Sequence, residues 1–286
     1  MSHPLGLNRV LSGFLPVTGL GWGLGWGLGV LLAIPLAGVR NANAALQIAW
    51  ESPSAAAPTV LKSFSLEELA KKKSATLTEA DPLTKGGKET AKFTGPSLAD
   101  LVAETTKILT AADRSTTDLV VLKTRSGKEV LMPKAFLVKY PSIQLALKRN
   151  GQALGPEAPR VVLPATSNAK IRGENILLEP MFVSELTDVT LTSYEKRYGA
   201  FFLKRRTDPA AMRGEKLYLQ NCVSCHTDPQ VAMTTLASAA KVDQIANGQH
   251  PDVSGAHDFK SIFDKKATRS LVSYLEAFKS QATAKN

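Results

Sequence analysis

Apolar residues follow three different patterns along this chain of 286 residues. Residues 20–38 are almost uninterrupted in their apolar character and rich in glycine. Between residues 59 and 192, short apolar runs alternate with glycine, proline and asparagine, which is typical of strands and turns. From residue 208 onwards, apolar residues recur at helical spacing. The pattern therefore predicts a leader, a mixed region of strands and helices, and a helical region.

The first 44 residues read as a signal peptide. The apolar stretch follows Arg9 and leads to the small residues 42–44, which fit a cleavage site before Ala45. The alternative is an uncleaved anchor that associates with a membrane, because about 20 apolar residues can cross a bilayer. Both interpretations place the folded part in the periplasm or another extracytoplasmic compartment, where disulfides are permitted.

Residues 45–200 are expected to form an α+β domain. Ser65 and Ser97 are placed as helix N-caps, each after a short apolar run. Residues 117–133 read as a β-hairpin with a glycine-containing turn, and residues 188–197 as a last strand.

Residues 208–286 are expected to form a separate all-α domain. Asp208 and Pro209 have the types preferred at the N-cap and first position of a helix. A second helix over residues 265–278 places apolar and aromatic side chains on one face, among them Tyr274.

Both cysteines of the chain lie in one short motif. Cys222, Cys225 and His226 form a CxxCH sequence, the signature of covalent c-type haem attachment. Two thiols at this spacing can each add to a vinyl group of one porphyrin, and the adjacent histidine can reach the iron as proximal ligand. A redox dithiol would not need the histidine, and an all-cysteine zinc site would need two further cysteines. The motif therefore predicts one covalent haem c.

The region 208–280 resembles the class I cytochrome c family. In that family the helix before the motif crosses the last helix of the domain, with a glycine and an aromatic residue on one face. Gly214, Tyr218 and Tyr274 stand at the corresponding positions here. The resemblance implies a small α-helical haem domain that transfers electrons.

The same family usually supplies a methionine as sixth iron ligand, but no methionine follows Met233. Met233 itself is only seven positions beyond His226 and is interpreted as a packing residue. His257 lies 17 positions before Tyr274, which matches the family's usual separation, and is placed first as distal ligand. His250, which precedes a proline as the usual methionine does, is the alternative. An iron without a sixth protein ligand is a further alternative.

Residues 59–192 resemble the small α+β domain of the sulfite oxidase-type molybdopterin family. The resemblance rests on short motifs in 91–101, 150–154 and 159–164. It places Arg160 near that family's cofactor region, although a structural role is the commoner one for such a residue. Enzymes of the family hold molybdenum through a cysteine thiolate. Because both cysteines belong to the CxxCH motif, no molybdenum is expected.

The distribution of charge along the chain indicates which kind of binding partner to expect. The chain has 35 Lys and Arg against 25 Asp and Glu, a net charge of +10. Residues 208–286 contain nine basic and eight acidic residues, so the rest of the chain carries 26 against 17, a net charge of +9. This asymmetry favours an acidic redox partner. An ordinary solvated basic surface is the alternative. The scattered lysines and the leader argue against a nucleic-acid ligand.

Together these observations predict a two-domain chain, an α+β molybdopterin-oxidoreductase-like domain followed by an all-α class I cytochrome c domain. We expect an exported mono-haem cytochrome that carries single electrons between a periplasmic dehydrogenase and a respiratory acceptor, with the first domain as scaffold or docking module. Apart from the haem motif, no catalytic constellation is recognisable. Two alternatives remain, an oxidoreductase subunit whose first domain binds its own cofactor and a haem sensor of small gases.

Overall fold

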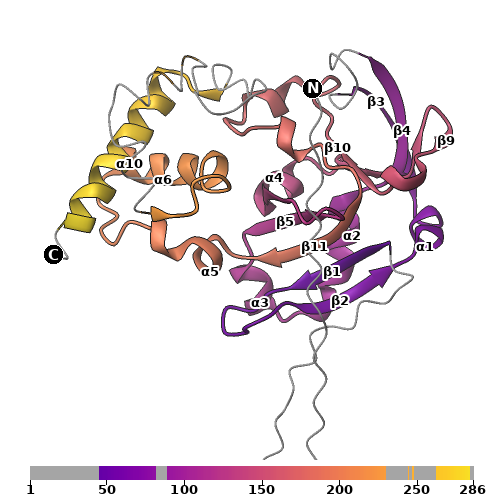
Figure 1. The fold of residues 1–286 in the computed structure, drawn as a ribbon, viewed down its shortest axis with the longest axis horizontal. Helices are drawn as coiled ribbons and strands as arrows, with labels where there is room; N and C mark the ends of the chain where they lie inside the picture. The colour runs from indigo at the N-terminus through magenta and orange to yellow at the C-terminus, as the bar shows by residue number, and fades with distance from the viewer. Residues whose placement is uncertain (1–44, 82–88, 230–243, 245–246, 248–261, 284–286) are drawn as a thin grey trace, which may run out of the picture. The chain divides into compact units, whose positions relative to one another are not determined.

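The computed structural model describes residues 45–81, 89–229, 244, 247 and 262–283. These residues belong to one compact unit, residues 37–286. Figure 1 shows its sheets and helices from the first strand to the last helix.

The largest sheet has five strands in the order β2-β1-β11-β5-β6. This sheet joins the two ends of the described strand region, because β1, the first strand in the chain, pairs in parallel with β11, the last. The remaining pairs are antiparallel, and β5 and β6 form the predicted hairpin, with Val121 opposite Leu131. The strands are β1 (Leu46–Trp50), β2 (Thr59–Phe64), β5 (Leu119–Thr124), β6 (Glu129–Pro133) and β11 (Leu186–Thr192).

Two smaller sheets lie beside it. One has the order β3-β4-β8-β9, and the other pairs β10 with β7. Gly95 in β4 allows a close approach of backbones, since a Cβ atom there would lie 2.0 Å from the Leu145 carbonyl oxygen. The strands are β3 (Ser74–Ala80), β4 (Thr90–Pro96), β7 (Gln144–Ala146), β8 (Lys148–Arg149), β9 (Gln152–Ala153) and β10 (Arg160–Val162).

The predicted helix starts at Ser65, Ser97 and Asp208 are confirmed. Ser65 forms a complete capping box with Glu68, and Asp208 accepts hydrogen bonds from the first turn of its helix. The predicted last strand is shorter than expected, because the chain turns into a helix after Ser193. The α-helices are α1 (Leu66–Ala70), α2 (Leu98–Thr105), α3 (Ala111–Thr116), α4 (Lys134–Lys139), α5 (Tyr194–Tyr198), α6 (Pro209–Asn221) and α10 (Lys265–Thr283). Short 3-10 turns span Thr106–Ile108, Gly155–Glu157, Ala169–Gly173, Glu179–Met181 and Gly199–Phe201.

At strand β5, both faces of the central sheet are buried. Val120 and Leu122 of β5 point into a core formed with β1, β11 and α2. The alternate residues Leu119 and Val121 point to the opposite face, where they join a second core with α6 and α10. This alternation follows from the two-residue period of a strand. Each fully buried aliphatic side chain contributes about 1.5–3 kcal/mol, so the helices that cover the second face are integral to the fold.

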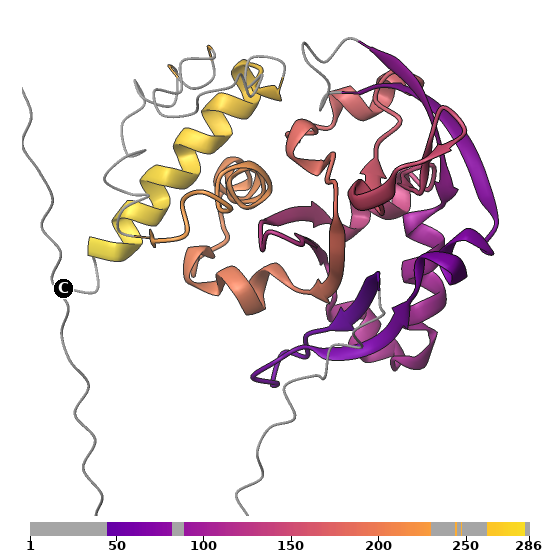
Figure 2. The same cartoon turned by 45° about the vertical axis from the view of Figure 1, so that its right-hand side comes forward.

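The prediction of a separate all-α cytochrome c domain over 208–286 is wrong. The described part of the chain is a mixed α/β structure, and no all-α domain is seen in it. Helices α6 and α10 share one apolar cluster with strands β5 and β6. Figures 1 and 2 show the two helices side by side. The helical spacing located both helices, but periodicity does not reveal which surface an apolar face covers.

Candidate cofactor-attachment site

Helices α6 and α10 cross at a glycine. A Cβ atom on Gly214 would lie 1.9 Å from the Ser270 carbonyl oxygen and 2.6 Å from the Tyr274 Cβ atom. Because backbone atoms occupy the space, only glycine permits this approach. The rings of Tyr218 and Tyr274 meet next to it, with centroids 5.4 Å apart. The predicted crossing of these two helices, through Gly214 and Tyr274, is therefore present.

The CxxCH motif forms a hydrogen-bonded turn at the end of α6. Cys222 is the C-cap, and its N–H donates to the Tyr218 carbonyl at 2.8 Å. The N–H groups of Cys225 and His226 then donate back to the Cys222 carbonyl, at 3.1 Å and 2.9 Å. Both cysteines and the histidine are thus gathered within one turn of backbone.

Tyr218 holds the far end of the same turn. Its hydroxyl donates to the His226 carbonyl at 3.1 Å. Its buried ring packs on Phe201 and Tyr274, with centroid distances of 5.4 Å in each case. Burial raises the pKa of the Tyr218 phenol above its ordinary value and thus further favours the neutral hydroxyl. No sequence pattern indicated this role, because it depends on how the turn folds back.

The two thiols differ in their surroundings. Both are free, and Cys222 is half-buried whereas Cys225 is exposed. Burial, and secondarily the proximity of Cys225, raises the pKa of the Cys222 thiol to about 12. A nucleophilic or metal-binding cysteine requires a thiolate, which a depressed pKa favours. Cys222 is consequently suited to a neutral sulfur, such as a thiol or a thioether.

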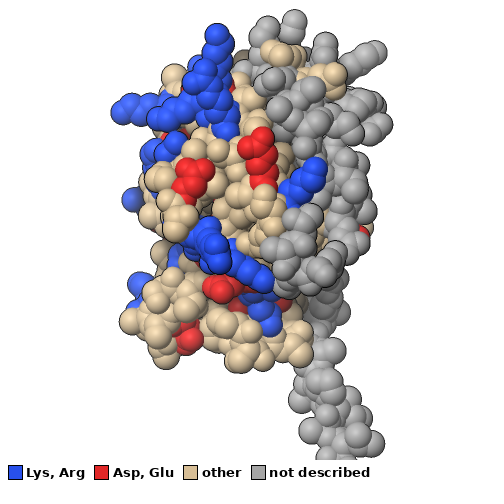
Figure 3. All heavy atoms as spheres, turned by 90° about the vertical axis from the view of Figure 1, so that its left-hand side faces the viewer, with Lys and Arg blue, Asp and Glu red and all other residues tan. Residues whose placement is uncertain are grey.

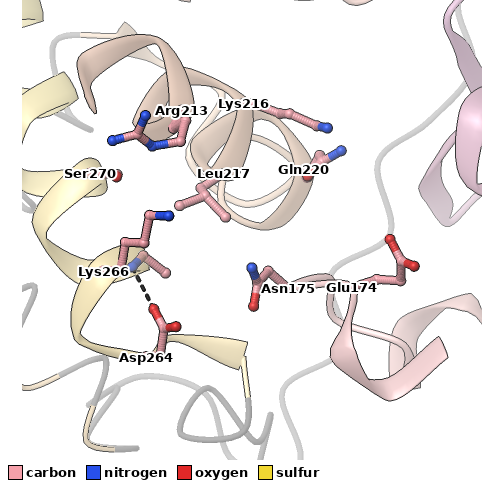
Figure 4. Close-up of a pocket in the computed structure, with 10 residues that line it drawn as sticks. Glu174, Asn175, Arg213, Lys216, Leu217, Gln220, Asp264, Lys266 and Ser270 are labelled. Carbon is pink, nitrogen blue, oxygen red and sulfur yellow. Dashed lines mark hydrogen bonds between the residues drawn. The ribbon is translucent and has the colours of Figure 1, made fainter. Parts of the chain in front are cut away.

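A cavity of about 370 Å³ lies between α6, the start of α10 and residues 174–175. Leu217 and Gln220 line it from α6, and Lys266 lines it from α10. Figure 4 shows Asn175 across the cavity from Lys266. Asp264 caps the start of α10, because its side chain accepts a hydrogen bond of 2.7 Å from the Ala267 N–H.

The residues of the motif fit a covalently attached haem. Their side chains come from one turn, and the sulfur and imidazole types match the two attachment points and one axial ligand that such a group requires. Within the described ranges, no group of three or more His, Cys, Asp and Glu side chains could hold a metal ion. A zinc site built on these cysteines therefore lacks further ligands in that part of the chain.

Several predicted residues lie outside the described part of the chain. They are the distal-ligand candidates His250 and His257, the methionine Met233, and the apolar leader segment 20–38. Among the helices that the structure describes, none is long and apolar enough to cross a membrane.

Arg160 has a structural environment. Its buried guanidinium contacts the buried Asp81 carboxylate through two hydrogen bonds, one of them 3.2 Å long. Asp81 also meets Arg149 at 3.3 Å, and the guanidinium lies over the Phe93 ring at 5.4 Å. This ion pair links β10 to the end of β3, and Asp81 was not identifiable from the sequence.

The charged surface is mixed. On the face in Figure 3, Lys and Arg side chains alternate with Asp and Glu side chains and do not form one continuous patch.

No protein-family model matches the chain, and no curated protein matches it. Among solved structures, the sulfane dehydrogenase SoxCD from Paracoccus pantotrophus aligns with a TM-score of 0.36 and 17% identity. The alignment covers 55% of this chain and 42% of that chain. A likeness of this size does not decide fold family or activity, so the molybdopterin-family resemblance of residues 59–192 stays a prediction.

Proposed function

We propose that this protein is an exported mono-haem c-type electron-transfer protein. One haem is attached through thioether bonds to Cys222 and Cys225, and His226 is the proximal iron ligand. The observation that carries this proposal is the CxxCH turn, in which backbone hydrogen bonds gather both sulfurs and the histidine at the end of α6.

The chain's own residues support this role in three ways. The two sulfurs would tether the ring to one side of the turn, and the exposed Cys225 leaves that side accessible. His226 directly follows the second cysteine and supplies an axial ligand, which a redox dithiol would not need. Tyr218 fixes the His226 carbonyl and so limits the orientations of that residue. When bound, the haem iron would supply reversible one-electron oxidation and reduction.

His257 is proposed as the sixth ligand, with His250 as the alternative. If one of them binds the iron, the wild-type protein has a six-coordinate low-spin spectrum. Replacing that histidine with alanine should abolish the low-spin spectrum, and replacing the other should not. A high-spin ferrous spectrum in the wild-type protein would instead favour the gas-sensor alternative.

The proposed electron route runs from a periplasmic dehydrogenase to a respiratory acceptor. The charge of +9 outside residues 208–286 supports an acidic partner. Because such attraction is screened by salt, transfer to an acidic partner should slow as ionic strength rises. Residues 45–200, the α+β part of the chain, are proposed as scaffold or docking surface without a molybdenum centre, since they contain no cysteine.

The attachment is tested by haem stoichiometry in protein produced together with a c-type haem maturation system. We expect one covalent haem per chain in the wild type and no stable covalent haem in Cys222→Ala/Cys225→Ala. Ser224→Ala, a change within the motif that keeps both thiols and the histidine, should retain full occupancy. Wild-type protein without covalent haem would contradict the proposal.

A further inference from the structure

The residue before the first cysteine connects the motif to a distant segment. Asn221 is buried, and its side-chain oxygen accepts a hydrogen bond from the Leu177 N–H at 2.9 Å. Its side-chain nitrogen donates to the Asn175 carbonyl at 3.0 Å and to the Leu217 carbonyl at 2.9 Å. One buried amide thus joins α6 to residues 175–177 through both of its polar atoms.

The segment on the other side of this contact is itself fixed. Asn175 has a positive φ of 53°, a conformation that asparagine tolerates well. The preceding Glu174 accepts hydrogen bonds from Lys139 and Tyr140, at the end of α4. Leu177 packs against the same hydrophobic cluster as Cys222. Residues 174–177 therefore present a defined backbone to Asn221.

Packing between this segment and α6 is incomplete, because Asn175 and the α6 residues Leu217 and Gln220 line a cavity of about 370 Å³. The Asn221 amide supplies directed hydrogen bonds to two backbone groups of the segment. A buried polar contact whose groups are all satisfied specifies one arrangement, because the alternatives leave groups without partners.

We propose that Asn221 is a positioning residue through which segment 175–177 fixes the CxxCH turn. The α+β part thereby sets how the attached haem is placed and how far it is exposed to solvent. Exposure and nearby hydrogen bonds are among the factors that tune a haem potential. This inference rests on the haem attachment proposed above, and it assigns the α+β part a role within the redox site.

Hydrogen exchange tests the connection without reference to haem. In Asn221→Ala, we expect the amides of 175–177 and of 222–226 to exchange about tenfold faster or more, because one contact restrains both. Gln220→Ala is the control, since Gln220 is adjacent and its side chain makes no hydrogen bond with the described residues. Faster exchange in only one of the two segments, or in neither, would overturn the proposal.

Redox titration tests the effect on the cofactor. At a fixed ambient potential, Asn221→Ala should change the ratio of reduced to oxidised haem at least about threefold, where tenfold corresponds to 59 mV for one electron. Gln220→Ala should match the wild type. An unchanged ratio in Asn221→Ala at equal haem content would overturn the proposal.

The test of Asn221 can be distinguished from the test of haem attachment in two further cases. If Asn221→Ala does not accumulate, Asn221→Asp keeps the acceptor for Leu177 but removes both donors, and the same two measurements decide on that variant. If the wild type carries no covalent haem, the proposed function fails, whereas the exchange experiment still decides whether Asn221 fixes the turn.

Discussion

The two sides of the central sheet use polar groups differently. On the first side, the core is mostly aliphatic, and a nearby buried pair, Arg160 and Asp81, joins strands of the smaller sheets. On the second side, the cluster combines aliphatic side chains with aromatic ones, among them Tyr218 of α6 and Tyr274 and Phe278 of α10. There the buried hydroxyl of Tyr218 and the amide of Asn221 bind the backbone around the CxxCH turn. The first side therefore stabilises the fold, and the second also positions the candidate site.

The largest effect on stability is expected for Arg160→Met. The substitution leaves the Asp81 carboxylate buried without the guanidinium that lies against it, although the partly exposed Arg149 still contacts it. Removing one partner of a buried ion pair costs about 3–5 kcal/mol. Chemical denaturation should show this loss, while the haem spectrum of the remaining folded protein stays unchanged. A changed spectrum would contradict the separation of roles between the two sides.

A smaller loss, about 1–3 kcal/mol or somewhat more, is expected for Gly214→Ala, because α6 and α10 must separate to admit the methyl group. This change should also alter the haem spectrum, since the helix end that carries the motif moves. Gly173→Ala is the control, because a Cβ atom there would meet nothing within 4 Å. An unaltered spectrum in a destabilised Gly214→Ala would show that the crossing does not position the site.

Tyr218→Phe removes one hydrogen bond and keeps the ring. We expect a loss of about 0.5–1.5 kcal/mol, together with a shift of the haem potential, because the His226 carbonyl loses its donor. Tyr274→Phe removes a comparable bond of 2.7 Å to the Phe201 carbonyl but leaves the turn intact. It should lower stability similarly without shifting the potential. Equal shifts in both variants would mean that Tyr218 has no special relation to the motif.

The smallest effect concerns the surface of the α+β part. Hydrogen bonds from Lys72 and Lys62 lower the pKa of Glu104 from 4.5 to about 2. A lowered carboxyl pKa contributes stability above the unfolded value, and this stability is lost as pH falls from about 4.5 towards 2. The Glu104 side chain is 41% exposed, so the contribution is at most about 1 kcal/mol after solvent screening.

Denaturation of Glu104→Gln across pH checks this ion pair. The variant should be slightly less stable than the wild type at pH 6, and the difference should vanish near pH 2. A difference that persists at low pH would assign the effect to something other than charge.

Local features of the fold were predictable from the sequence. Ser65 with Glu68, and Asp208 with Pro209, specify helix starts through contacts within a few residues. The packing of α6 and α10 was not predictable, because residues 119–122 are apolar at every position and do not reveal that both faces of β5 are covered. If the second face of β5 were exposed to solvent, polar residues would alternate with apolar ones along the strand.

The candidate site likewise has residues that the sequence identifies and residues that only the fold identifies. The spacing of Cys222, Cys225 and His226 encodes their chemistry directly in the sequence. The role of Asn221 depends on partners 44 and 46 positions earlier in the chain, for which no local pattern exists. Long-range polar contacts of this kind become visible only when the fold is known.

The central claim is covalent haem attachment, and peptide mass mapping tests it most directly. Trypsin cleaves after Lys216 and Lys241, so residues 217–241 form one peptide that contains both cysteines and His226. We predict that this peptide, from protein matured with a c-type haem system, carries one haem bound to Cys222 and Cys225. Recovery of the same peptide with two free thiols, or with a disulfide between them, would contradict the proposed function.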